Sequence, residues 1–108
     1  MVERTARIQV PAKARRGEIV QVRCMIMHPM DNGYRFDSQG TRIPVHLIHT
    51  LACRYNGEEV FRASLGTGTA ANPNLAFHTI ATESGTLEFT WLDDDGSVTT
   101  ARARIEVE

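Results

Sequence analysis

Residues 47–65 read LIHTLACRYNGEEVFRASL. Asn56-Gly57 lies at the centre, and both residues tolerate the positive φ angles that a type I′ hairpin turn requires. Polar and apolar residues alternate on both sides of this pair, as in strands with one buried face. We therefore predict a hairpin with strands Ile43–Tyr55 and Glu58–Leu65. One face of the first strand would carry Leu47, His49, Leu51, Cys53 and Tyr55.

The same alternation recurs along the rest of the chain, with Gly, Pro and Asn between the segments. It predicts further strands over Ala6–Val10, Ile19–Met27, Leu75–Thr82, Thr86–Asp93 and Ser97–Val107. Residues 31–42 are polar and indicate a loop or a loose hairpin. About seven short strands without a helical pattern favour an all-β, immunoglobulin-like antiparallel sandwich, in one domain spanning residues 1–108. A small barrel is the alternative.

Composition excludes some classes of function. The 108 residues carry a net charge of -1, which argues against a nucleic-acid binder held by bulk positive charge. Hydrophobic residues make up 42%, enough for a folded core. We expect no membrane partner, because no segment approaches the roughly 20 apolar residues of a membrane span. The start of the chain lacks the pattern of a signal peptide, which by itself would indicate the cytoplasm.

A cluster of soft ligands spans Cys24 to Met30 and includes Met25, Met27 and His28. Thioether and imidazole groups at this density would suit Cu(I). Cys24 and Met25 project from opposite faces of a strand, however, so a strand with Met on its outer face is favoured. Exposed Met25 and Met27 would then form an apolar interface patch.

Other candidate sites are weaker. Asp93, Asp94 and Asp95 could attract Ca²⁺, but no oxygen-ligand loop surrounds them, and Asp-Gly favours a turn by itself. His46 and His49 fall on opposite faces of a regular strand, and no nucleophile motif lies beside a histidine. Cys24 and Cys53 match no zinc spacing and are expected to be buried, although one bridge between facing strands stays open. We predict no catalytic residue, no cofactor and no metal.

Four strings, in this order, resemble one known family. They are His-Pro-Met-Asp-Asn-Gly at 28–33, Tyr-Asn-Gly-Glu-Glu-Val-Phe at 55–61, Ala-Asn-Pro-Asn-Leu-Ala-Phe at 71–77, and Glu-Ser-Gly-Thr through Asp-Asp-Asp-Gly at 83–96. Over essentially its full length the chain is similar to the SoxZ family, the Z subunits of the sulfur-oxidation carrier complex SoxYZ.

The resemblance implies a non-catalytic, all-β partner of SoxY. In that heterodimer, sulfur intermediates of thiosulfate oxidation are attached to a cysteine on the Gly-rich C-terminal arm of SoxY, and pathway enzymes dock transiently. This chain ends in a strand without such an arm, so we expect it not to carry the sulfur. The resemblance also implies a periplasmic location, reached by export with a signal-bearing partner. Met25, Met27, His28, Met30, Asn72 and Pro73 are the predicted interface residues.

Two alternatives stay open at this point. A free-standing immunoglobulin-like binding module would be a stable monomer without a partner. A Cu(I)-handling domain would take up copper through Met27, His28 and Met30.

Overall fold

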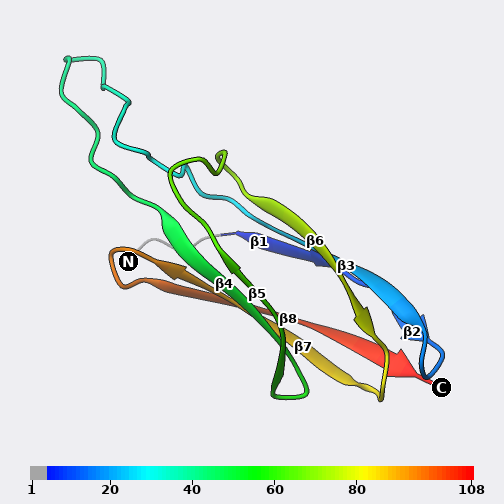
Figure 1. The fold of residues 1–108 in the computed structure, drawn as a ribbon. Coiled ribbons are helices and arrows are strands. Elements are labelled where there is room, and N and C mark those ends of the chain that lie inside the picture. Colours follow the sequence, from blue (N-terminus) through cyan, green and yellow to red (C-terminus); the bar gives the residue numbers. More distant parts are fainter. Residues whose placement is uncertain (1–4) are drawn as a thin grey trace.

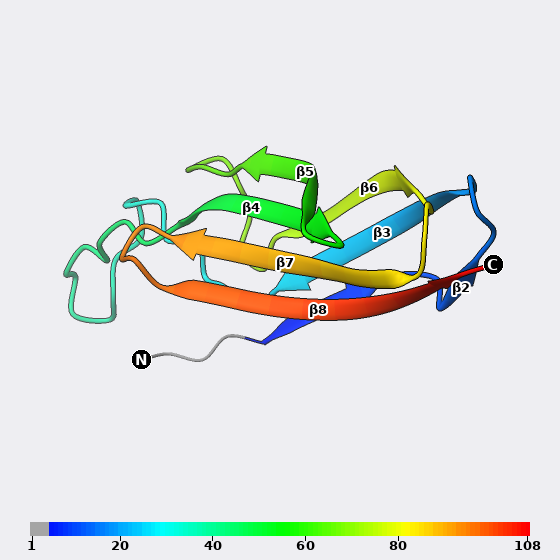
Figure 2. The same cartoon turned by 90° about the horizontal axis from the view of Figure 1, so that it is seen from below.

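The computed structural model describes residues 5–108, which form two facing β-sheets (Figures 1 and 2). The strands are β1 (Ala6–Gln9), β2 (Lys13–Ala14), β3 (Ile19–Ile26), β4 (Ile48–Tyr55), β5 (Glu58–Ser64), β6 (Asn74–Ile80), β7 (Gly85–Asp93) and β8 (Val98–Val107). One sheet has the order β1-β3-β6 and the other β2-β8-β7-β4-β5. The predicted all-β sandwich is confirmed, and the sheets do not close into a barrel.

The structure differs in two ways from the predicted antiparallel sandwich of about seven strands. It has one additional strand, β2, which is two residues long, and β2 pairs with the end of β8 in parallel rather than antiparallel. A segment this short carries no alternation that a sequence could reveal. The start of the chain, where the sequence shows no signal-peptide pattern, includes residues 1–4, which lie outside the described range. No helix in residues 5–108 is long and apolar enough to cross a membrane.

The hairpin at Asn56-Gly57 forms as predicted. Asn56 has a φ of 50° and Gly57 a φ of 85°, the two positive values of a type I′ turn. The turn joins β4 to β5, which lies at the edge of the five-stranded sheet. The turn sets the pairing of Tyr55 with Glu58 and of Arg54 with Glu59, and a register shift between Cys53 and Arg54 follows.

The start of β4 differs from the prediction. β4 begins at Ile48 rather than at Ile43. Pro44 cannot donate to a strand ladder, and Ile43 and His46 donate their N–H groups to the carbonyls of Arg35 and Asp31 in the preceding loop. A register shift between Ile48 and Thr50, opposite β7, then interrupts the alternation. The predicted placement of His49 on one face with Leu51 and Cys53 is wrong, because His49 is exposed whereas those two residues are buried.

The core fills the space between the two sheets. Alternate residues of β3 and β7 are buried in it, as predicted: Val20, Val22, Cys24, Ile26, Leu87, Phe89 and Trp91. Phe61 of β5 stacks on Phe77 of β6 with ring centroids 4.3 Å apart, which joins the edges of the two sheets. Phe77 in turn lies 6.2 Å from Phe89 of β7. Aromatic packing thus connects the layers along one side.

The connection from β3 to β4 extends beyond one end of the sheets (Figure 1). At its base, the Asp31 N–H donates to the His46 carbonyl over 2.9 Å, and the His46 N–H donates to the Asp31 carbonyl over 2.8 Å. A second bridge joins Phe36 and Arg42. The predicted loose hairpin over residues 31–42 is therefore present. Its base holds His46 against the end of β7.

Candidate functional site

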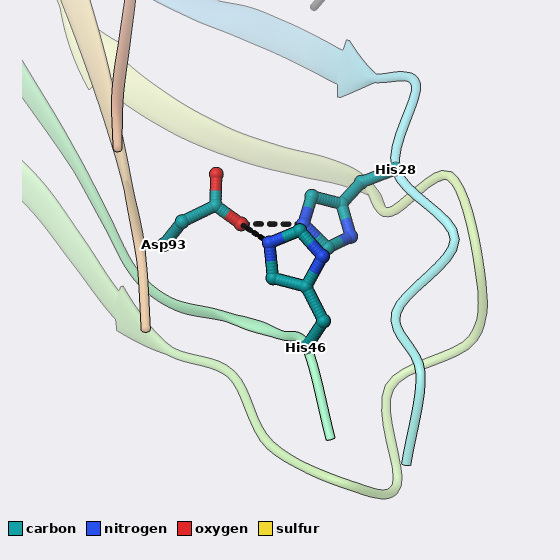
Figure 3. A group of neighbouring side chains, drawn as sticks. All are labelled: His28, His46 and Asp93. Atoms are coloured by element: carbon teal, nitrogen blue, oxygen red, sulfur yellow. Dashed lines mark hydrogen bonds and ion pairs between the residues drawn. The ribbon is translucent and has the colours of Figure 1, made fainter. Parts of the chain in front are cut away.

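Three polar side chains meet at the end of the sandwich from which this loop extends (Figure 3). His28 follows β3 of the smaller sheet, His46 precedes β4, and Asp93 is the last residue of β7. One ligand atom of each residue lies within 4.8 Å of the others. The cluster therefore links both sheets and the loop.

His28 is held in one orientation by four hydrogen bonds. Its backbone N–H donates to Asn72 Oδ1 over 2.9 Å, and its carbonyl accepts from the Asn72 N–H over 2.7 Å. In the ring, Nδ1 accepts the Met30 N–H over 2.9 Å, so it carries no proton. The proton of the neutral ring is consequently on Nε2, which donates to Asp93 Oδ1 over 2.5 Å. This assigns the tautomer of His28.

Asp93 is a carboxylate with a fully buried side chain. It continues the period-two series of Leu87, Phe89 and Trp91, so the pleat turns it into the sandwich. A buried carboxylate is stable only with hydrogen-bond donors, and His28 supplies one. His46 Nε2 lies 3.5 Å from the same Oδ1 atom.

The β7–β8 turn adds a second carboxylate. Gly96 has a φ of 89°, and Asp95 Oδ1 accepts the Ser97 N–H over 2.8 Å, as expected for an Asp-Gly turn. The other oxygen of Asp95, Oδ2, lies 3.2 Å from His46 Nε2. The hydrogen bonds from Ser97 and then the proximity of His46 lower the pKa of Asp95. His46 therefore lies between two carboxylates.

The predicted interface residues divide by exposure. Met27 and Asn72 are exposed and Met25 is half-buried, whereas His28, Met30 and Pro73 are buried. Their role at an interface stays a prediction, and only the first three can contact a partner directly in this conformation. The hydrogen bonds between Asn72 and His28 bring together two of the four family motifs, those at 28–33 and 71–77.

Neither cysteine is bonded in a disulfide, and both are buried, as expected. They lie on facing strands, Cys24 on β3 and Cys53 on β4. Burial raises the pKa of Cys24 to about 11. Burial, followed by the proximity of Cys24, raises the pKa of Cys53 to about 12. Both groups stay protonated at neutral pH, which makes them poor nucleophiles and poor metal ligands.

Two of the three residues that could bind Cu(I), His28 and Met30, make hydrogen bonds within the protein instead. The His28 ring uses both nitrogens within the protein, and Met30 Sδ accepts the Ile48 N–H over 3.4 Å. Met27, the third member, points to solvent and is 47% exposed. A Cu(I) ion held by these three residues would have to break buried hydrogen bonds.

The sequence pattern indicates only the end of a strand and a turn for Asp93 and Asp95, and no role for His46. One signal was available in the series Leu87, Phe89, Trp91, because the next inward position is Asp93. A carboxylate at an inward position requires a partner. The identity of this partner could not be predicted from the sequence, because His28 lies 65 residues from Asp93 in the chain.

The family model described as sulphur oxidation protein SoxZ matches residues 8–104. The chain belongs to the SoxZ family. No curated protein sequence matches it. Among solved structures, a superoxide reductase (neelaredoxin) from Ignicoccus hospitalis is 23% identical, with a TM-score of 0.74, over 98% of this chain and 82% of that one.

The sulfur carrier protein SoxY from Chlorobium limicola f thiosulfatophilum is 13% identical, with a TM-score of 0.68, over 95% of this chain and 78% of that one. A putative superoxide reductase from Thermotoga maritima is 17% identical, with a TM-score of 0.68, over 95% and 85% of the two chains. At these identities the likeness concerns the fold alone.

Proposed function

We propose that this SoxZ-family chain is the non-catalytic subunit of a sulfur-carrier heterodimer with a SoxY-type partner. The partner bears the sulfur on the cysteine of its Gly-rich arm, and enzymes of thiosulfate oxidation dock on the pair transiently. The pair is periplasmic, and this chain is exported with the signal-bearing partner. The observation that carries the proposal is the family match over residues 8–104.

The state of the two thiols supports the non-catalytic role. Sulfur transfer to a cysteine requires a thiolate that the donor can reach. Cys24 and Cys53 are buried, and their pKa values are raised to about 11 and about 12. These properties support the proposal that the cysteine that accepts sulfur belongs to the partner.

The partner surface in this proposal lies at the end where the β3–β4 loop extends. Met27 is 47% exposed there, and the loop carries exposed Tyr34, Phe36 and Val45. Aromatic residues and Met are enriched at the centre of protein interfaces. Asn72 belongs to this surface, because its backbone and side chain pair with His28 next to Met27. We call Met27, Tyr34, Phe36, Val45 and Asn72 the loop-end surface.

Co-expression with a SoxY-type subunit tests both the proposed heterodimer and its proposed interface. Light scattering after size exclusion is expected to show a one-to-one complex, and absence of a complex would overturn the function. Met27→Glu places a charge on the loop-end surface and is expected to weaken the complex at least about tenfold. Ile80→Glu is the matched control, since Ile80 is 53% exposed on β6. A complex weakened only by Ile80→Glu would move the interface to that edge.

A further inference from the structure

The distances around His46 fit the coordination of a metal ion. His46 Nε2 is 3.5 Å from Asp93 Oδ1 and 3.2 Å from Asp95 Oδ2. Bonds of about 2.1 Å to a tetrahedral ion place neighbouring ligand atoms about 3.4 Å apart, and octahedral bonds place them about 3.0 Å apart. Both observed distances fall in or close to this range. Each carboxylate oxygen can therefore share an ion with His46 Nε2 without large movement.

His28 belongs outside the coordination sphere. Its Nε2 is only 2.5 Å from Asp93 Oδ1, too short for two ligands of one ion. Binding through Nε2 would also require a proton on Nδ1, where the Met30 N–H already donates. His28 instead donates to a metal-binding carboxylate, which is the usual role of an outer hydrogen-bond partner. It would fix the Asp93 oxygen that faces His46.

An ion can reach this position from solvent. The side chain of His46 is 30% exposed and that of Asp95 is 49% exposed. Both line a shallow hollow of about 550 Å³, together with Asp31, Ile43, Pro44, Val45 and Asp94. Asp93 is fully buried and does not line the hollow, but its Oδ1 atom lies 3.5 Å from His46 Nε2, which does. An ion held by His46, Asp93 and Asp95 would face this open hollow, which leaves one coordination position for water.

We propose that His46, Asp93 and Asp95 bind one divalent transition-metal ion of the Zn²⁺ class. One imidazole and two carboxylates suit Zn²⁺, Co²⁺ or Mn²⁺ and carry no thiolate or thioether that would select Cu(I). The ion would join the base of the β3–β4 loop to the β7–β8 turn. It would therefore stiffen the end of the molecule that carries the loop-end surface. The binding itself does not depend on the proposed function.

Calorimetric titration of the tag-free chain with Zn²⁺ tests the site. One ion per chain is expected, with a rise in the unfolding midpoint that EDTA reverses. Asp95→Asn is the principal variant, because Asn keeps an oxygen for the Ser97 N–H while losing the ligand charge. Asp95→Asn and His46→Ala are each expected to weaken Zn²⁺ binding about 100-fold. His28→Gln should weaken it by about 10- to 100-fold.

Matched controls separate this site from histidines that bind zinc weakly on any surface. His78 is exposed on β6, far along the chain from the cluster, and His78→Ala should leave the titration unchanged. The Co²⁺-loaded chain should show visible ligand-field bands without a thiolate charge-transfer band. If Zn²⁺ binds only in the millimolar range, or binds equally to folded Asp95→Asn, the proposal is overturned. His46 would then be only an ion-pair partner of the two carboxylates.

Discussion

The hydrogen bond between His28 and Asp93 should be one of the largest single contributions to the stability of this sandwich. Both side chains are fully buried. His28→Ala removes a hydrogen bond to a charged acceptor, worth about 1.5–3 kcal/mol. It also leaves the buried Met30 N–H without its acceptor, at a cost of about 1–3 kcal/mol. We expect the free energy of unfolding to fall by about 3–5 kcal/mol.

Urea denaturation followed by tryptophan fluorescence measures this loss, because Trp91 is buried two residues before Asp93. With an m value of about 1.5 kcal/mol/M, the midpoint should fall by about 2–3 M. His28→Gln restores a donor for Asp93, whereas His28→Asn restores an acceptor for the Met30 N–H. We expect His28→Gln to recover more stability than His28→Asn, because it donates a hydrogen bond to the buried Asp93 carboxylate.

His78→Ala is the matched control and should change the free energy of unfolding by no more than about 0.5 kcal/mol, since His78 is exposed. If His28→Ala lowered stability by less than about 1 kcal/mol, the hydrogen bonds assigned to His28 would not be made in solution. A loss in His28→Gln as large as in His28→Ala would refute the role of Asp93 as the main partner.

Three further predictions concern the core and the hairpin. Because burial raises the pKa values of Cys24 and Cys53 from 9.0 to about 11 and about 12, the unfolded chain loses these protons first. The resulting stabilisation is complete below pH 9 and is lost as the pH rises towards 12, which urea midpoints at pH 8, 9 and 10 should show. Ellman's reagent at pH 8 should react with the native thiols at least about 100-fold more slowly than with the unfolded chain, and equal rates would contradict their burial. A Cβ at Gly85 would overlap Asn56 Oδ1, which accepts the Thr86 N–H. Gly85→Ala should therefore cost about 1–2 kcal/mol, and most of this loss should disappear in an Asn56→Gly background.

The sequence predicted the strands where a period of two runs uninterrupted. The buried faces of β3 and β7 and the turn at Asn56-Gly57 follow from side-chain alternation and from backbone sterics, which are local properties. The irregularity between Ile48 and Thr50 was not predictable, because it arises from how β4 meets β7. It separates the exposed His49 from the buried face that carries Leu51 and Cys53.

The candidate site was predictable only in part. The inward position of Asp93 could be read from the strand pattern, but its contacts with His28 and His46 depend on the ends of both sheets and on the base of a long loop. Such contacts join residues far apart in sequence, where no periodicity applies. Met30 and Pro73 show the same limit, since both lie in loops and are nevertheless buried.

We propose that this SoxZ-family chain supports a sulfur carrier without carrying the sulfur itself. Co-purification of the tagged chain from its native host during growth on thiosulfate, followed by intact-mass analysis, tests it most directly. We expect one tightly bound partner that ends in a Gly-rich cysteine arm, with sulfur adducts on that partner and none on Cys24 or Cys53. A monomer without a partner, or adducts on the cysteines of this chain, would contradict it.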